Sequence, residues 1–181
     1  MGAVRSLIEN EDIRNEDVEK ITIWQPSYFA ENFVAFPPTS SVDTASSLKY
    51  VVGAYMILRK IGVEWYEKYQ EIMADPAFKE ISGKIEIIKD EGLQALFDKE
   101  NIVKGKVEIR TRKRVFEKEM RLEELKGNPR NNPMSFEDVK EKFLELAVPV
   151  IGEDKCRSFL GSLDKGDPSL RISELMRSLV L

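Results

Sequence analysis

The sequence contains no histidine. Histidine is the side chain that titrates near neutral pH without a shifted pKa. Its absence excludes Ser-His-Asp and Cys-His catalysis and removes the most common ligand of zinc sites. Any acid–base catalysis must therefore come from a carboxylate, a lysine or a tyrosine whose pKa is shifted. We expect no metal site and no cofactor.

Cysteine is almost as scarce, because Cys156 is the only one. A single cysteine excludes an internal disulfide framework and suggests a reducing compartment. With no histidine to act as its base, Cys156 is predicted to be buried and inert. The sequence also lacks an apolar run of about 18 residues, which a transmembrane helix needs. The N-terminal segment MGAVRSLIENED becomes acidic too early for a signal peptide. We therefore expect a cytoplasmic protein that does not bind membranes.

The remaining composition is that of a folded domain. The 181 residues include 42% hydrophobic and 33% charged side chains, which suits one domain or one domain with an appendage. The net charge of −4, from 28 basic and 32 acidic residues, argues against a nucleic-acid partner. The basic run RTRKR at 110–114 is either an anion-binding strand pair or a solvated outer face. We favour the second, because glutamates lie nearby and no aromatic residues interleave.

Hydrophobic periodicity predicts an α+β fold, with a small antiparallel or mixed sheet packed with helices. The predicted strands are 18–25, 85–89, 106–112 and 114–121. The first three have alternating apolar and polar residues or short β-branched runs, and the fourth continues the alternation of the third. An ordered loop is expected over 27–42, where phenylalanines and a Pro-Pro pair gather. The main helices are expected at 3–9, 45–61, from 76 onward, and 136–148.

The chain divides into two predicted parts. Residues 1–125 form an α+β domain, and 126–181 form a C-terminal helical extension that packs on it or on a partner. The apolar faces of the extension exceed what three or four strands can cover.

The start of the helix predicted over 45–61 carries the candidate site. Ser47 and Tyr50 are three residues apart and share a helix face, with Lys49 between them. They lie near the positive end of the helix dipole, where an anion is stabilised. A tyrosine hydroxyl at this place can donate to a substrate carboxylate or carry a proton. The structural alternative is also open, because serine at a helix start and tyrosine on a core helix are ordinary.

The segment DTASSLKYVVGAYMI, which carries these residues, resembles a motif of the MmgE/PrpD family. The family sequence is Asp-Ala-Lys-Phe-Ser-Leu-Pro-Tyr followed by an apolar helix, and Asp43, Ser47, Leu48 and Tyr50 fall in register with it. Similarity continues in AVRSLIENEDIRNEDVEKITIW before the motif, and in DPAFKEISGKIEII and KGNPRNNPMSFEDVKEKFLELAVPVIGEDKC after it. The ordered set of segments covers nearly the whole sequence.

This resemblance implies a fold and a chemistry. The family includes 2-methylcitrate dehydratase, cis-aconitate decarboxylase and iminodisuccinate epimerase, with an active site between a large helical domain and a smaller α+β lid. This sequence is similar to the lid and the helices that follow it. The resemblance implies that Tyr50 is catalytic and that Ser46, Ser47 and Lys49 are the neighbouring substrate-binding residues. Lys49 replaces the usual proline of the motif. The family's catalytic histidines lie in the helical half, which this sequence lacks.

Three hypotheses follow for the function. The chain is the lid half of an enzyme for small di- and tricarboxylates, inactive alone, with a separate helical-domain polypeptide as partner. Alternatively, it is a stand-alone homodimeric domain without catalytic activity, which binds a small acid or a protein. A third hypothesis is a degenerate remnant that folds without activity.

Overall fold

The computed structural model describes residues 1–33, 36–164, 171–177 and 179. The chain forms two compact units, Met1–Asn131 and Asn132–Leu181. The division that we predicted from the sequence lies after residue 125, a few residues earlier. Each unit is described by itself.

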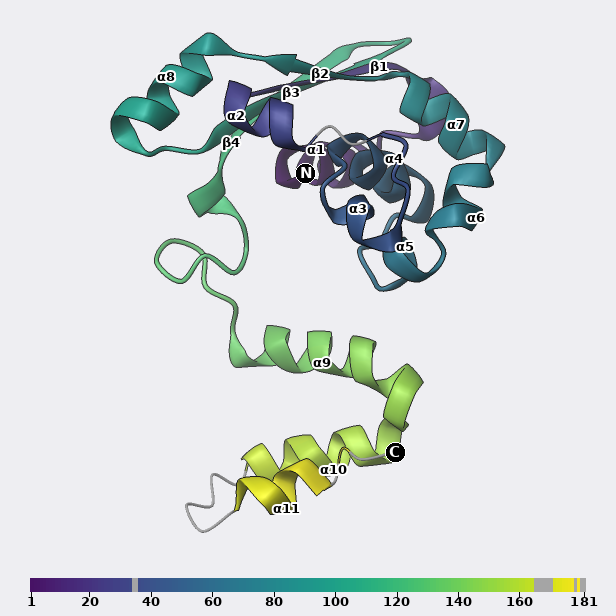
Figure 1. The fold of residues 1–181 in the computed structure, drawn as a ribbon, viewed down its shortest axis with the longest axis vertical. Coiled ribbons are helices and arrows are strands. Elements are labelled where there is room, and N and C mark those ends of the chain that lie inside the picture. The colour runs from purple at the N-terminus through teal and green to yellow at the C-terminus, as the bar shows by residue number, and fades with distance from the viewer. Residues whose placement is uncertain (34–35, 165–170, 178, 180–181) are drawn as a thin grey trace. The chain divides into compact units, whose positions relative to one another are not determined.

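The first unit is built on a four-stranded mixed sheet (Figure 1). The strand order is β2-β1-β3-β4, with β2 parallel to β1 and the other pairs antiparallel. The strands are β1 (Val18–Gln25), β2 (Ile85–Lys89), β3 (Lys104–Thr111) and β4 (Val115–Arg121). The predicted α+β class and mixed sheet are confirmed. The first two strands have the predicted bounds, and the hairpin strands differ from them by one or two residues.

The two faces of the sheet differ sharply. Ile21, Ile23, Val107 and Ile109 are buried in the core, where helices α1 (Gly2–Glu11) and α4 (Leu48–Leu58) pack against the strands. Figure 1 shows these helices under one face and no helix of the first unit over the other. That other face carries ion pairs that bridge neighbouring strands: Lys20–Glu86, Lys104–Glu119 and Lys106–Glu117. Alternation along each strand therefore sends apolar side chains inward and charges to solvent.

The hairpin tip of β3 and β4 carries the basic run at 110–114. Its charged side chains are exposed, and two of them form ion pairs, Arg110 with Glu108 and Arg114 with Glu11. This arrangement fits the interpretation of the run as a solvated outer face.

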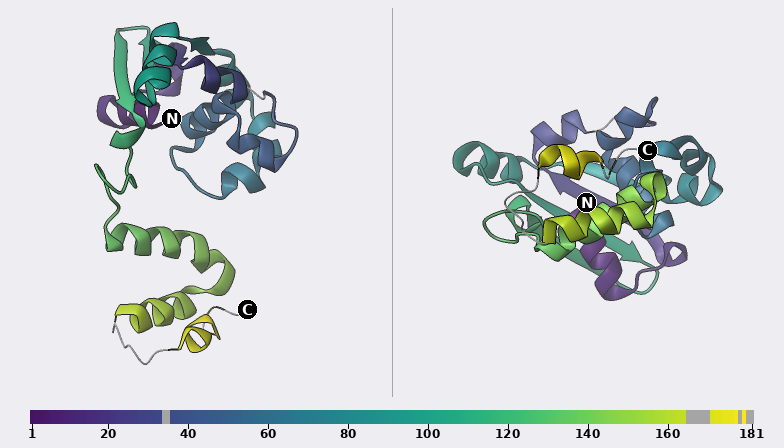
Figure 2. Two further views of the ribbon diagram at one scale, coloured as in Figure 1. Left: turned by 60° about the vertical axis from the view of Figure 1, so that its left-hand side comes forward. Right: turned by 90° about the horizontal axis from the view of Figure 1, so that it is seen from below.

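The other helices of the first unit gather at two ends of the sheet (Figures 1 and 2). At one end, α2 (Ser27–Asn32) contacts α8 (Glu91–Glu100). At the other lie α3 (Ser41–Ala45), α5 (Glu64–Glu67), α6 (Tyr69–Ala74) and α7 (Pro76–Gly83). The predicted loop over 27–42 is therefore wrong in part. Residues 27–32 form a helix because Phe29 stacks with Phe33 and packs edge-on against Phe97.

The described part of the second unit consists of α9 (Phe136–Ile151), α10 (Glu153–Asp164) and α11 (Ile172–Arg177). Helix α9 was predicted to end before Pro149 but continues through it. The missing N–H of Pro149 affects only the last turn, since the chain leaves the helix at Gly152 with φ 86°. Cys156 is buried, as predicted. Helix α11 ends at Arg177, and residue 178 lies outside the described residues.

Candidate functional site

The helix predicted over 45–61 is observed as α4, which begins at Leu48 and ends at Leu58, and the short helix α3 precedes it, separated by Ser46 and Ser47. Asp43 belongs to α3. It forms a capping box with Ser40 at the start of α3, where the Ser40 hydroxyl accepts from the Asp43 amide. Ser47 then serves as the N-cap of α4, and its Oγ accepts a hydrogen bond from the Tyr50 amide at 3.4 Å. The break places the candidate residues at the first turn of an 11-residue helix.

Tyr50 lies in the core of the first unit with no exposed surface. Its hydroxyl donates to the backbone carbonyl of Trp65 at 2.7 Å, and its ring packs 5.6 Å from the ring of Phe78. Burial raises the pKa of Tyr50 to about 12, so the phenol is neutral at pH 7. Its one proton is engaged with the Trp65 carbonyl.

The other three candidate residues point in different directions from the same segment. Ser47 is fully buried, whereas Ser46 is exposed at the end of α3. Lys49 is half-buried, and its ammonium lies 5.0 Å from the centroid of the Phe36 ring. The structure thus brings Ser47 and Tyr50 together inside the unit, and leaves Ser46 and Lys49 on the outer side.

Lys49 lines a hollow of about 360 Å³, which we call the lysine pocket. Its walls are Phe36, Pro37, Met73 and Phe78, and the rim is completed by Lys79, Ser82 and Gly83 of α7. Sequence reasoning missed Lys79, because the segment DPAFKE shows only a capped helix start. The sequence places Lys79 in the first turn of a helix, three residues after the N1 proline. It does not show that Lys79 lies near Lys49, because the packing of α7 on α4 brings the two residues to one pocket.

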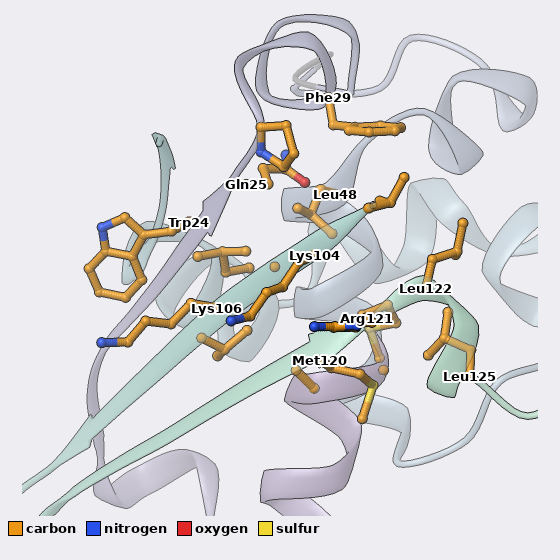
Figure 3. Close-up of a pocket in the computed structure, with 18 residues that line it drawn as sticks. Trp24, Gln25, Phe29, Leu48, Lys104, Lys106, Met120, Arg121, Leu122 and Leu125 are labelled. Atoms are coloured by element: carbon orange, nitrogen blue, oxygen red, sulfur yellow. The ribbon is translucent and has the colours of Figure 1, made fainter. Parts of the chain in front are cut away.

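A second hollow of about 240 Å³ lies at one end of the sheet, and we call it the apolar pocket (Figure 3). Figure 3 shows Phe29 and Leu48 at one side and Met120, Leu122 and Leu125 at the other. The cationic side chains that line it are paired with carboxylates: Lys104 with Glu119, Lys106 with Glu117 and Arg121 with Glu123. Its lining is therefore mostly apolar, with its charged side chains in ion pairs.

Gln25 also lines the apolar pocket. Its Nε2 is buried and has no hydrogen-bond partner among the described residues. A buried amide nitrogen without a partner is uncommon. The Gln25 side chain therefore presents an unused hydrogen-bond donor at the lining of the apolar pocket.

Within residues 1–33, 36–164, 171–177 and 179, no group of three or more acidic or cysteine side chains is placed to hold a metal ion. In the same residues, no helix is long and apolar enough to cross a bilayer.

The first unit is thus a small α+β domain with a four-stranded mixed sheet and two hollows, the lysine pocket and the apolar pocket. Residues 1–162 match the family model of the MmgE/PrpD C-terminal domain. The chain therefore belongs to the MmgE/PrpD family and corresponds to its C-terminal domain. No curated protein matches the sequence significantly.

Proposed function

We propose that this chain is the lid half of an MmgE/PrpD-type enzyme that acts on small di- and tricarboxylates. The observation that carries the proposal is the family match over residues 1–162 in a sequence without histidine. Family chemistry removes a proton next to a carboxylate and then eliminates, decarboxylates or epimerises. In this proposal a second, helical polypeptide supplies the histidines, and substrate lies near the start of α4 at Ser46–Tyr50.

Tyr50 has a defined task in this proposal. A phenol with a pKa near 12 is a proton donor at neutral pH, and it has only one proton to give. Tyr50 therefore reaches substrate only when its hydroxyl leaves the Trp65 carbonyl, to which it now donates. Docking of the helical polypeptide is the event that we propose to cause this change.

The chain alone lacks most of the acid–base groups. One general acid or base contributes roughly 10²–10⁴-fold to a rate, and groups that act as a unit are not additive. We therefore expect turnover by the isolated chain to be at least about 10⁴-fold below that of the complex.

The alternative function, a homodimer without catalytic activity, is favoured by one observation. In the second unit, Val150 is 64% exposed, Ile172 78% and Met176 53%. Large exposed apolar surfaces are usually covered by a partner, and a second copy of this chain would serve as well as a helical polypeptide.

The native mass of the untagged protein, purified from its own cells, separates the two functions. We expect it to co-purify with a larger, histidine-containing helical chain encoded nearby. The complex and the isolated chain are then assayed with citrate-like acids for dehydration, decarboxylation and epimerisation. Turnover by the complex alone supports the lid proposal, and a Tyr50→Phe complex should lose it while still assembling. A homodimer without a second chain and without turnover contradicts the proposal and supports the alternative.

A further inference from the structure

The lysine pocket combines apolar walls with two cations that have no counter-charge among the described residues. Its titratable lining residues are Lys49 and Lys79, and no carboxylate belongs to the lining. Among the described residues, no carboxylate oxygen lies within 4 Å of either ammonium. The apolar pocket differs in this respect, since its three cationic side chains are all paired.

The carboxylates closest in sequence are engaged elsewhere. Glu80, next to Lys79, forms an ion pair with Lys84 at 2.7 Å. Asp75, at the start of α7, accepts a hydrogen bond from the Ala77 amide at 2.7 Å. Neither acid lines the pocket, so both charged side chains in its lining are positive.

Helix electrostatics give an independent reason to expect an anion. Lys49 lies in the first turn of α4, where the helix dipole is positive and a cation is unfavourable. Helix stability therefore does not explain a lysine at this position. An anion between Lys49 and Lys79 offsets that repulsion and is itself favoured by the helix terminus.

The shape of the pocket suits a small ligand. A volume of about 360 Å³ lies in the range of about 300–1,000 Å³ that is typical of ligand pockets. Phe78 is almost fully buried and forms part of the wall. A short carbon skeleton can rest against Phe78 and Met73 while charged groups reach the two ammoniums.

We propose that the lysine pocket binds a small di- or tricarboxylate, with one carboxylate at Lys49 and another at Lys79. The ligand class rests on the proposed function, whereas the place and the role of Lys79 rest on the pocket itself. Phe78 connects the pocket to Tyr50, because its ring lies 5.6 Å from the Tyr50 ring and the residue also lines the pocket. Lys79 is thus a specificity-determining residue that the family motif does not contain.

The test is a titration of the full chain with tricarballylate at low ionic strength, followed by amide NMR shifts and calorimetry. Low salt is needed because exposed charges are screened within about 10 Å at 0.1 M. Lys49→Gln and Lys79→Gln are each expected to weaken binding by about tenfold. Lys99→Gln is the matched control, because Lys99 is an exposed helical lysine of α8, away from the pocket lining. Propionate and inorganic phosphate serve as comparison ligands.

The expected result is saturable binding of tricarballylate that moves amides at Lys49, Lys79 and Phe78. Propionate should bind more weakly, because it reaches only one ammonium. Tighter binding of phosphate than of tricarballylate overturns the ligand class, and unchanged affinity in Lys79→Gln overturns the site. Absence of binding also overturns it, even if the complex with the helical chain turns over. Specific binding without any such complex would instead sustain the pocket and contradict the proposed enzyme.

Discussion

The two units of the chain bury their apolar side chains to very different extents. In the first unit, Val52, Met56 and Ile109 have no exposed surface. In the described part of the second unit, Cys156 is the only buried residue, although α9 to α11 carry many apolar side chains. Isolated helices are marginal in water, and most helical stability comes from packing of an apolar face. The comparison teaches that the first unit closes its own core, whereas the described helices of the second unit leave most of their apolar side chains at least partly exposed.

The largest expected effect tests this contrast directly. Ile109→Ala, in the central part of β3, should lower the free energy of unfolding by about 2–5 kcal/mol, because it leaves a cavity in a closed core. Val150→Ala, at a 64% exposed position of α9, should change it by no more than about 0.5 kcal/mol. Urea unfolding of both variants checks the difference.

The control for this pair is protein concentration. If Val150→Ala costs as much as Ile109→Ala, and the loss vanishes on dilution, a second copy already covers α9 in the purified protein. That outcome would remove the contrast between the units and support the homodimer.

The sequence predicted the sheet better than the helices around it. The bounds of β1 and β2 follow from short runs of β-branched residues that are bounded by turn signals. The α3–α4 break was missed because Ser46 and Ser47 fit a helical turn as well as a cap. In the structure Ser46 is the C-cap of α3, and Ser47 is the N-cap of α4, where its Oγ accepts from the Tyr50 amide.

The candidate site was predictable only in part, for a similar reason. Family resemblance leads to Tyr50 and its neighbours, but it does not show which of them face the interior. Ser47 and Tyr50 are buried because the N-cap and the Trp65 carbonyl hold them there. Lys79 is distant from Lys49 in sequence, and only the packing of α7 on α4 brings both to one pocket.

A second prediction concerns pH and asks whether Tyr50 belongs to the closed core. The pKa of Tyr50 is about 12 in the folded chain because of burial, against about 10 when unfolded. The folded state holds this proton more tightly, so the stabilisation is complete below pH 10 and is lost as the pH rises toward 12. At pH 11 the loss from this group is about 1.4 kcal/mol. Urea unfolding at pH 8 and pH 11 measures it.

Tyr50→Phe is the matching control for the pH experiment. At pH 8 it should cost about 1–3 kcal/mol, because the Trp65 carbonyl loses its donor. Between pH 8 and pH 11 it should lose about 1.4 kcal/mol less than the natural chain. Identical pH dependence in the two proteins would mean that the Tyr50 hydroxyl titrates normally and already faces solvent.

The smallest expected effect is the difference in stability between variants of two adjacent serines, Ser46 and Ser47. It tests whether the start of α4 belongs to the closed core of the first unit. Ser47→Ala should cost about 1 kcal/mol, because the Tyr50 amide loses its N-cap acceptor inside the unit. Ser46→Ala should stay within about 0.5 kcal/mol, since Ser46 is exposed. Thermal and urea unfolding of both variants give the difference.

Equal losses of stability in the two variants would indicate that Ser46 also holds the break between α3 and α4. No loss for Ser47→Ala would mean that packing of Tyr50, and not the cap, fixes where α4 begins.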